Sequence, residues 1–266
     1  MLGDRASLHA KSPIISISPD ASLLDAIDLM SSRGIRRVRV SRDGEHLFTT
    51  IDAIIRLLSE MSKLFTDDRS LRQVRIGSTN LVKPPVIKGD YTVRETAKIM
   101  SNSNVDFAVI MGEELESIIT VTDLMDSVEE GELDVPVLEY ASRRYPTIGV
   151  SSKLIDAVKL MSTFRVRSVL ATDGEMILGS VSSRHILKLI SKYGFSILGD
   201  DIESSVKPIR AFAEPSSTLG NVIRLMRLTG SEVAVLNIGT HVVGVVDEAR
   251  VISGIAGISE PGNRMA

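Results

Sequence analysis

The chain has no cysteine and no tryptophan, and only 4% of its 266 residues are aromatic. The absence of cysteine excludes disulfides, thiolate nucleophiles and cysteine-based zinc sites, and it is typical of a protein of the reducing cytosol. So few aromatic residues cannot form a stacking platform for single-stranded nucleic acid. We therefore expect a cytoplasmic protein that binds no nucleic acid.

Long apolar runs and a strong net charge are also missing. No run approaches the roughly 20 apolar residues that a membrane helix needs, so no membrane contact is expected. The net charge is −3, and 43% of the residues are hydrophobic and 24% charged, which is typical of a globular protein. The four histidines are not grouped at ligand spacing, so no metal site is predicted.

Four segments repeat one pattern, in which apolar residues recur at helical spacing and the segment ends in methionine. The segments are residues 22–30, 92–100, 153–161 and 218–226. In the first two, Ser22 and Thr92 precede Asp25 and Glu95 by three residues, which predicts capping boxes. The four final residues are predicted to be core side chains: Met30, Met100, Met161 and Met226.

A short β-rich run follows each helical segment, and its centre lies 8 residues after the methionine in every copy. A further strand and a second helix come next, and an extended stretch precedes each copy. The repeated unit therefore predicts the order strand–helix–strand–strand–helix, which is an α+β fold with small sheets. The copies are expected at about residues 12–60, 80–130, 140–193 and 204–257.

One such unit is too small to bury its apolar faces alone, so the copies are expected to pair. The acidic stretch 129–132, interpreted as a solvated linker, divides the chain into 12–130 and 137–257. Each half is expected to hold two small sheets with helices packed between its two copies. Residues 260–266 are expected to form a tail.

This repeat resembles the cystathionine-β-synthase (CBS) domain family, over nearly the whole stretch from Ser12 to Gly257. The resemblance rests on the repeated helix and on a signature of the form glycine–apolar–apolar–Thr/Ser–x–x–Asp. It implies four CBS motifs that pair into two Bateman modules, an architecture similar to that of the γ subunit of AMP-activated protein kinase. It also implies a regulatory protein that binds AMP, ADP, ATP or S-adenosylmethionine in clefts between paired motifs.

The signature differs among the four copies. The residues interpreted as its glycine, hydroxyl and acid are His46, Thr49 and Asp52; Ser117, Thr120 and Asp123; Gly179, Ser182 and His185; and Gly244, Asp247 and Arg250. The resemblance implies that sites lacking the acid are often empty. Copies one and two are therefore the predicted sites, copy three is a weaker candidate, and copy four is the poorest.

The chemistry of the signature suits a nucleotide. A carboxylate can accept hydrogen bonds from both ribose hydroxyls, so Asp52 and Asp123 are the predicted ribose contacts. The hydroxyls of Thr49 and Thr120 stand at a strand end, on the predicted phosphate side.

Arginines bind phosphate bidentately, and four of them stand just before a central strand. They are Arg36 and Arg37 in copy one, and Arg165 and Arg167 in copy three. The adenine needs an apolar slot, for which the leading stretches offer four residues. These are Ile15, Ile17, Val86 and Ile87.

Other interpretations of these residues remain open. Thr-x-x-Asp alone is more often a helix cap than a ligand site, and Arg36, Arg37 and Arg39 fit a solvated strand face equally well. No nucleophile elbow, P-loop or GxGxxG is present, which argues against an enzyme and a catalytic cofactor. An S-adenosylmethionine-binding regulator and a scaffold with degenerate sites are the alternatives. The sequence leaves open a homodimer and an unidentified regulated protein partner.

Overall fold

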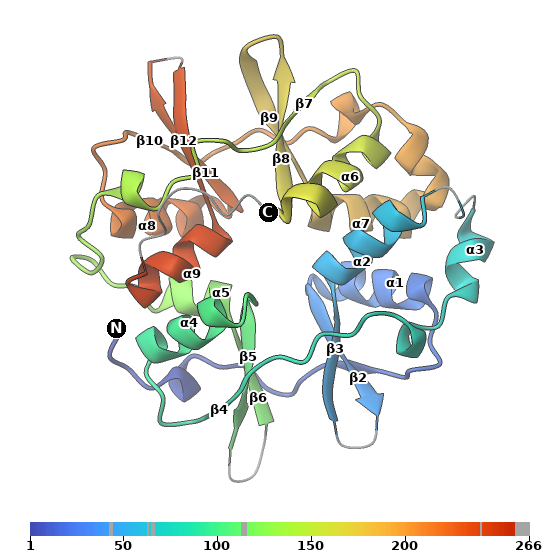
Figure 1. Ribbon diagram of the computed structural model, residues 1–266, viewed down its shortest axis with the longest axis horizontal. Coiled ribbons are helices and arrows are strands. Elements are labelled where there is room, and N and C mark those ends of the chain that lie inside the picture. The colour runs from blue at the N-terminus through green and yellow to red at the C-terminus, as the bar shows by residue number, and fades with distance from the viewer. Residues whose placement is uncertain (43–44, 63, 65–66, 113–115, 240, 259–266) are drawn as a thin grey trace. The chain divides into compact units, whose positions relative to one another are not determined.

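The computed structural model describes residues 1–258 apart from 43–44, 63, 65–66, 113–115 and 240 (Figure 1). The predicted α+β class is confirmed, because the described residues form nine α-helices and four three-stranded sheets. In each sheet the central strand pairs in parallel with the leading strand and antiparallel with the last one. The predicted tail, residues 260–266, lies outside the described residues.

The predicted element order is confirmed in all four copies. Copy one contains β1 (Ser16–Ile17), α1 (Leu23–Arg33), β2 (Arg37–Arg42), β3 (Glu45–Thr50) and α2 (Ile51–Glu60). Copy two contains β4 (Val86–Lys88), α4 (Val93–Asn102), β5 (Phe107–Met111), β6 (Glu116–Thr120) and α5 (Val121–Asp126). Copy three contains β7 (Thr147–Gly149), α6 (Leu154–Phe164), β8 (Ser168–Asp173), β9 (Met176–Ser182) and α7 (Ser183–Tyr193). Copy four contains β10 (Phe212–Ala213), α8 (Leu219–Thr229), β11 (Val233–Ile238), β12 (His241–Asp247) and α9 (Glu248–Ala256). The remaining helix, α3 (Asp68–Gln73), lies between copies one and two in the sequence.

The first helices of copies one and two begin at the capping boxes that the sequence predicts. The backbone N–H of Ser22 donates to Asp25 at 2.9 Å, and that of Asp25 donates to the Ser22 hydroxyl at 3.1 Å. The pair Thr92 and Glu95 makes the same two bonds at 2.8 and 3.2 Å. The hydrogen bonds from the cap residue lower the pKa of both carboxyl groups, so these helix starts are fixed by charge as well as by geometry.

The described chain divides into two compact units, and neither consists of sequential copies. One unit comprises Ile15–Lys83 and Pro146–Pro208, which hold copies one and three; we call it the 1/3 unit. The other comprises Met1–Ile14, Pro84–Tyr145 and Ile209–Ala266, which hold copies two and four; we call it the 2/4 unit. Each unit has its own hydrophobic core.

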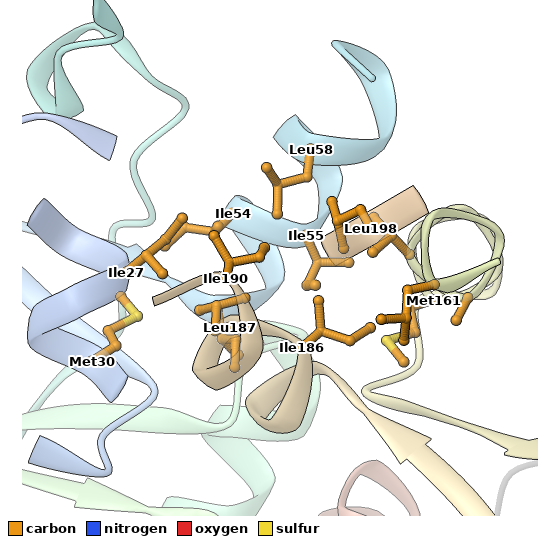
Figure 2. Close-up of a cluster of buried hydrophobic side chains, with 14 of the residues drawn as sticks. Ile27, Met30, Ile54, Ile55, Leu58, Met161, Ile186, Leu187, Ile190 and Leu198 are labelled. Atoms are coloured by element: carbon orange, nitrogen blue, oxygen red, sulfur yellow. The ribbon is translucent and has the colours of Figure 1, made fainter. Parts of the chain in front are cut away.

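The core of the 1/3 unit lies among helices α1, α2, α6 and α7. Figure 2 shows side chains from copy one and copy three pointing toward one another there. The labelled ones are Ile27, Met30, Ile54, Ile55, Leu58, Met161, Ile186, Leu187, Ile190 and Leu198. In the 2/4 unit, α9 packs against α4 and α5 in the same manner. The four repeat methionines are at most 2% exposed, which confirms them as core residues.

The helix packing expected between sequential copies is therefore found between alternate copies. All four copies present similar amphipathic helices, so the apolar pattern requires a partner for each helix pair without specifying which copy supplies it. The boundaries of the two predicted modules, 12–130 and 137–257, stay a prediction.

The segment before each copy pairs with the last strand of the neighbouring copy in sequence. The bridges join Lys11 to Ile118, Val82 to Phe48, Ser142 to Val245, and Lys207 to Ser180. The segment before copy one thus lies on copy two, and the segment before copy two lies on copy one. Copies three and four exchange their leading segments in the same way.

The acidic stretch 129–132 is largely exposed, as its interpretation as a solvated linker predicts, and it also makes contacts within the 2/4 unit. The carboxylate of Glu132 accepts the backbone N–H of Leu2 at 2.9 Å, and Glu130 forms an ion pair with Arg224 at 3.2 Å. A Cβ at Gly220 would lie 2.2 Å from the Glu132 carbonyl oxygen, so glycine is required at this helix start. The stretch therefore contacts the N-terminal residues and the first helix of copy four.

Candidate functional site

The second helix of each copy starts directly after the last strand, with a polar N-cap. The N-cap residues are Thr50, Thr120, Ser182 and Asp247. The residues three positions later are Ala53, Asp123, His185 and Arg250. The strand register supports this equivalence, because the residue before each cap pairs with the centre of the middle strand. The hydroxyl and acid of the signature therefore correspond to the N-cap and to the third helical residue.

The predicted register of copy one is wrong by one residue. Thr49 is buried in β3 opposite Val38, whereas the Thr50 hydroxyl caps α2 by accepting the N–H of Ala53 at 3.2 Å. The counterpart of Asp123 is consequently Ala53 and not Asp52. The glycine position is likewise Leu47, which pairs with Val40, and not His46. Two consecutive threonines allow both alignments in the sequence, and only the strand pairing decides between them.

Asp123 of copy two is a buried carboxylate with a partner on each oxygen. Its side chain is 2% exposed. Oδ2 accepts the backbone N–H of Thr120 at 2.8 Å and its hydroxyl at 2.7 Å, and Oδ1 lies 2.7 Å from Nζ of Lys11. The helix-cap interpretation is thus confirmed for this pair.

Lys11 contacts the candidate site at Asp123 and was not identified from the sequence. Its side chain is 70% exposed, and its hydrogen bond to Asp123 raises the pKa of the ammonium. The leading segment carries it onto copy two, and Lys207 occupies the equivalent position on copy three. The sequence signal is weak, because a lysine before one repeat gives no sign that it acts on the next.

Asp52 and Arg167 bind each other, although they were predicted to contact ligands at two different sites. Nε of Arg167 lies 3.0 and 3.1 Å from the two carboxylate oxygens, and its Nη2 lies 2.6 Å from Oδ2. The side chains are 43% and 20% exposed. This bidentate pair joins α2 of copy one to the start of β8 in copy three, so the carboxylate of Asp52 is already occupied by a cation.

The remaining predicted arginines have separate roles. Arg36 and Arg37 are buried at the start of β2, so the solvated-face interpretation is wrong for both. The carbonyl of Arg36 accepts the N–H of Ile51 at 2.8 Å and thereby positions the start of α2. Arg165 is exposed and ends α6 at a φ of +54°, a left-handed conformation that glycine adopts at the ends of α1 and α8.

Copy three places a neutral side chain where copy two has its acid. The Ser182 hydroxyl accepts the N–H of His185 at 3.3 Å, which makes it the cap of α7. Burial lowers the pKa of His185, and the charges of Lys207 and Lys188 lower it further. In copy four, Asp247 accepts the N–H of Arg250 at 3.1 Å, so it too is a helix cap.

Of the four residues predicted to form the adenine slot, three lie in or against a hydrophobic core and one is exposed. Ile15 and Ile17 lie partly buried against the core of the 1/3 unit. Ile87 belongs to the core of the 2/4 unit, whereas its neighbour Val86 is exposed, as the alternation of side chains in a strand requires. Among the described residues there is no group of three or more His, Asp or Glu that could hold a metal ion. Nor does any helix of the described ranges combine the length and hydropathy needed to cross a membrane.

A family model described as the CBS domain matches residues 7–59, 78–130 and 137–192. These matches cover copies one, two and three and more than half of the chain. The chain therefore belongs to the CBS domain family. A search of curated proteins gave no significant match.

Two solved structures share the fold over nearly the whole chain. Protein MJ1225 from Methanocaldococcus jannaschii, proposed as an archaeal homologue of g-AMPK, has a TM-score of 0.79 and 16% identity, over 94% of this chain and 99% of that one. An uncharacterised conserved protein from Pyrococcus horikoshii has a TM-score of 0.62 and 15% identity, over 95% and 100% of the two chains. At such identities the likeness concerns the fold alone.

Proposed function

We propose that this chain is a regulatory protein that binds an adenosine phosphate, AMP, ADP or ATP, through copy two. CBS domains generally bind adenosine ligands and act in regulation. The observation that carries the proposal is the Asp123 carboxylate, which is buried and reached by one largely exposed lysine. A ribose hydroxyl would donate to its Oδ1, while Oδ2 stays in the helix cap with Thr120.

Copy one is a poorer candidate for a ligand site than the sequence suggested. Its Asp52 is one position away from the counterpart of Asp123, and Arg167 bonds both of its carboxylate oxygens, whereas Lys11 bonds only Oδ1 of Asp123. We propose that copy three, with Ser182, His185 and Lys207, contacts the phosphate side of a ligand instead of the ribose. Copy four, with Asp247 and Arg250 as its capping pair, is the poorest site.

The larger architecture follows from the same proposal. Residues 204–257 repeat the element order of the other copies and would form a fourth CBS motif. The stretches 12–130 and 137–257 would be the sequences of two Bateman modules. The exchange of leading segments favours this grouping, whereas the helices pack between copies one and three and between copies two and four. We also propose that the protein acts in the cytoplasm on a regulated partner, and that it binds neither nucleic acid nor membrane.

Calorimetry with AMP, ADP, ATP and S-adenosylmethionine tests the function. We expect an adenosine phosphate to bind most tightly, and chromatography after long incubation to recover it unchanged. Preferential binding of S-adenosylmethionine would replace the ligand class. Conversion of the ligand would identify an enzyme, and the absence of binding by all four compounds would leave a scaffold.

A further inference from the structure

The backbone of the leading segment crosses each copy at one equivalent place. In copy two, the N–H of Lys11 donates to the carbonyl of Ile118 at 2.8 Å, and the N–H of Ile118 donates back at 2.9 Å. The crossing residues of the other three copies are Val82, Ser142 and Lys207. Copy two alone among the described sites combines a crossing lysine with an acidic residue at the third helical position.

The ion pair between Lys11 and Asp123 leaves donors available on the lysine. An ammonium has three N–H donors, so it can hold Oδ1 of Asp123 and bind a second acceptor at the same time. The Lys11 side chain is 70% exposed, whereas the carboxylate is 2% exposed. The lysine is thus the solvent-facing part of the pair, and a ligand approaching the carboxylate meets the ammonium first.

We propose that Lys11 is the residue that selects the ligand class of copy two, favouring adenosine 5′-phosphates over uncharged and cationic adenosine compounds. This inference rests on the proposed function, because it needs a ribose at Asp123. The 5′ substituent is attached to the same sugar ring as the hydroxyls, so a positive charge beside the carboxylate acts on it at short range. That substituent is an anionic phosphate in AMP, a neutral hydroxyl in adenosine, and a cationic sulfonium in S-adenosylmethionine.

The charge of the surrounding unit does not make this choice. The 2/4 unit holds 12 Lys and Arg against 19 Asp and Glu, a formal charge of −7, which opposes a phosphate. Salt screens exposed charges beyond a distance of about 8 Å under physiological conditions. The carboxylates nearest the ammonium, those of Asp123 and Asp126, raise its pKa and so keep it charged.

The test is a comparison of ligand affinities in the full chain with and without the lysine. We expect Lys11→Met to lower the ratio of AMP affinity to adenosine affinity about tenfold, since it removes one charged hydrogen-bond donor. Lys11→Arg keeps the charge and should keep the ratio. Lys153→Met is the matched control, because Lys153 pairs with Asp201 at 2.8 Å in the 1/3 unit.

A ratio is the appropriate readout because any loss of folding in the variant lowers both affinities equally. Adenosine binding by Lys11→Met also reports whether the site itself is intact. An unchanged ratio in Lys11→Met would overturn the inference. If at the same time Asp123→Asn weakens the binding of both AMP and adenosine, the proposed function stands without it. If the unaltered chain binds neither AMP nor adenosine, both fall together.

Discussion

Asp52 and Asp123 stand near the start of equivalent helices, yet their surroundings give them different chemistry. Asp123 is buried and accepts bonds from Thr120 and Lys11, whereas Asp52 is 43% exposed and is held by a guanidinium. A displacement of one residue along a helix turns the side chain by about 100°, which is enough to move a carboxylate from one surrounding to the other. The register of the cap therefore decides which of the two acids lies at the third helical position, where we propose that the ligand binds.

His185 should make the stability of the 1/3 unit depend on pH. Burial and the charges of Lys207 and Lys188 lower its pKa below the usual 6.5. The unfolded chain therefore takes up a proton here at a higher pH than the folded chain does. Stability from this residue is complete above about pH 6.5 and is lost as the pH falls toward the lowered value.

Urea unfolding at about pH 7.5 and about pH 5.5 measures this effect. The chain should lose stability at the lower pH, and His185→Gln should lose less because glutamine does not titrate. The carboxyl groups with lowered pKa, Asp4, Asp25 and Glu95, titrate below this window, so they do not contribute. An equal loss in the variant would show that His185 is not the responsible group.

At the scale of the elements, the leading segments that cross copies three and four explain why β9 and β12 each contain a glycine at the crossing. A Cβ at Gly179 of β9 would lie 2.3 Å from the carbonyl oxygen of Lys207, on the segment that crosses copy three. A Cβ at Gly244 of β12 would lie 2.9 Å from Cβ of Ala141, on the segment that crosses copy four. The signature glycine of these two copies thus permits a close backbone approach.

Gly179→Ala should therefore destabilise the chain by about 1–3 kcal/mol, the usual cost of overpacking. Gly149→Ala is the matched control, since it also lies in a strand of copy three and its Cβ would approach nothing closer than the Ser152 hydroxyl at 3.9 Å. Thermal unfolding of the two variants gives the comparison. Equal melting temperatures would mean that the leading segment can move aside without cost.

Most individual elements could be predicted from the sequence. The constant spacing from each methionine located all four central strands, and the capping boxes of α1 and α4 follow from local patterns. The end of β3 could not be placed, because Thr49 and Thr50 are both good strand and cap residues. The pairing of β3 with β2 places the end of β3 at Thr50. Such pairing is a contact between separate segments, so a local sequence pattern does not reveal it.

At the scale of the whole molecule, charge is distributed unevenly between the two units. The 1/3 unit holds 19 Lys and Arg against 15 Asp and Glu, a formal charge of +4, whereas that of the 2/4 unit is −7. The segments of the two units alternate along the chain, so a net charge of −3 conceals the difference. Net charge favours anions at the 1/3 unit, whereas the proposed nucleotide site lies in the acidic 2/4 unit and therefore depends on specific contacts.

Each unit takes one copy from each half of the chain, so a fragment that holds one half lacks part of both cores. Residues 1–130 contain copies one and two, and therefore half of the helices of each core. The fragment would expose the apolar helix faces that pack against copies three and four in the full chain, and large exposed apolar surfaces favour association. We expect the fragment to elute as a dimer in light-scattering chromatography, and fragment 131–266 to convert it into a one-to-one complex. A monomer that unfolds as cooperatively as the full chain would contradict this account.

The central claim is that Asp123, and not Asp52, is the carboxylate that binds the ribose of an adenosine phosphate. Calorimetric titration of AMP into Asp123→Asn and Asp52→Asn tests it most directly, because both changes remove one charge near the start of a second helix. The account predicts that Asp123→Asn weakens binding by about 1.5–3 kcal/mol, as expected for hydrogen bonds to a charged group. It predicts that Asp52→Asn changes the affinity by no more than about 0.5 kcal/mol. Unchanged affinity in Asp123→Asn, or a larger loss in Asp52→Asn, would contradict it.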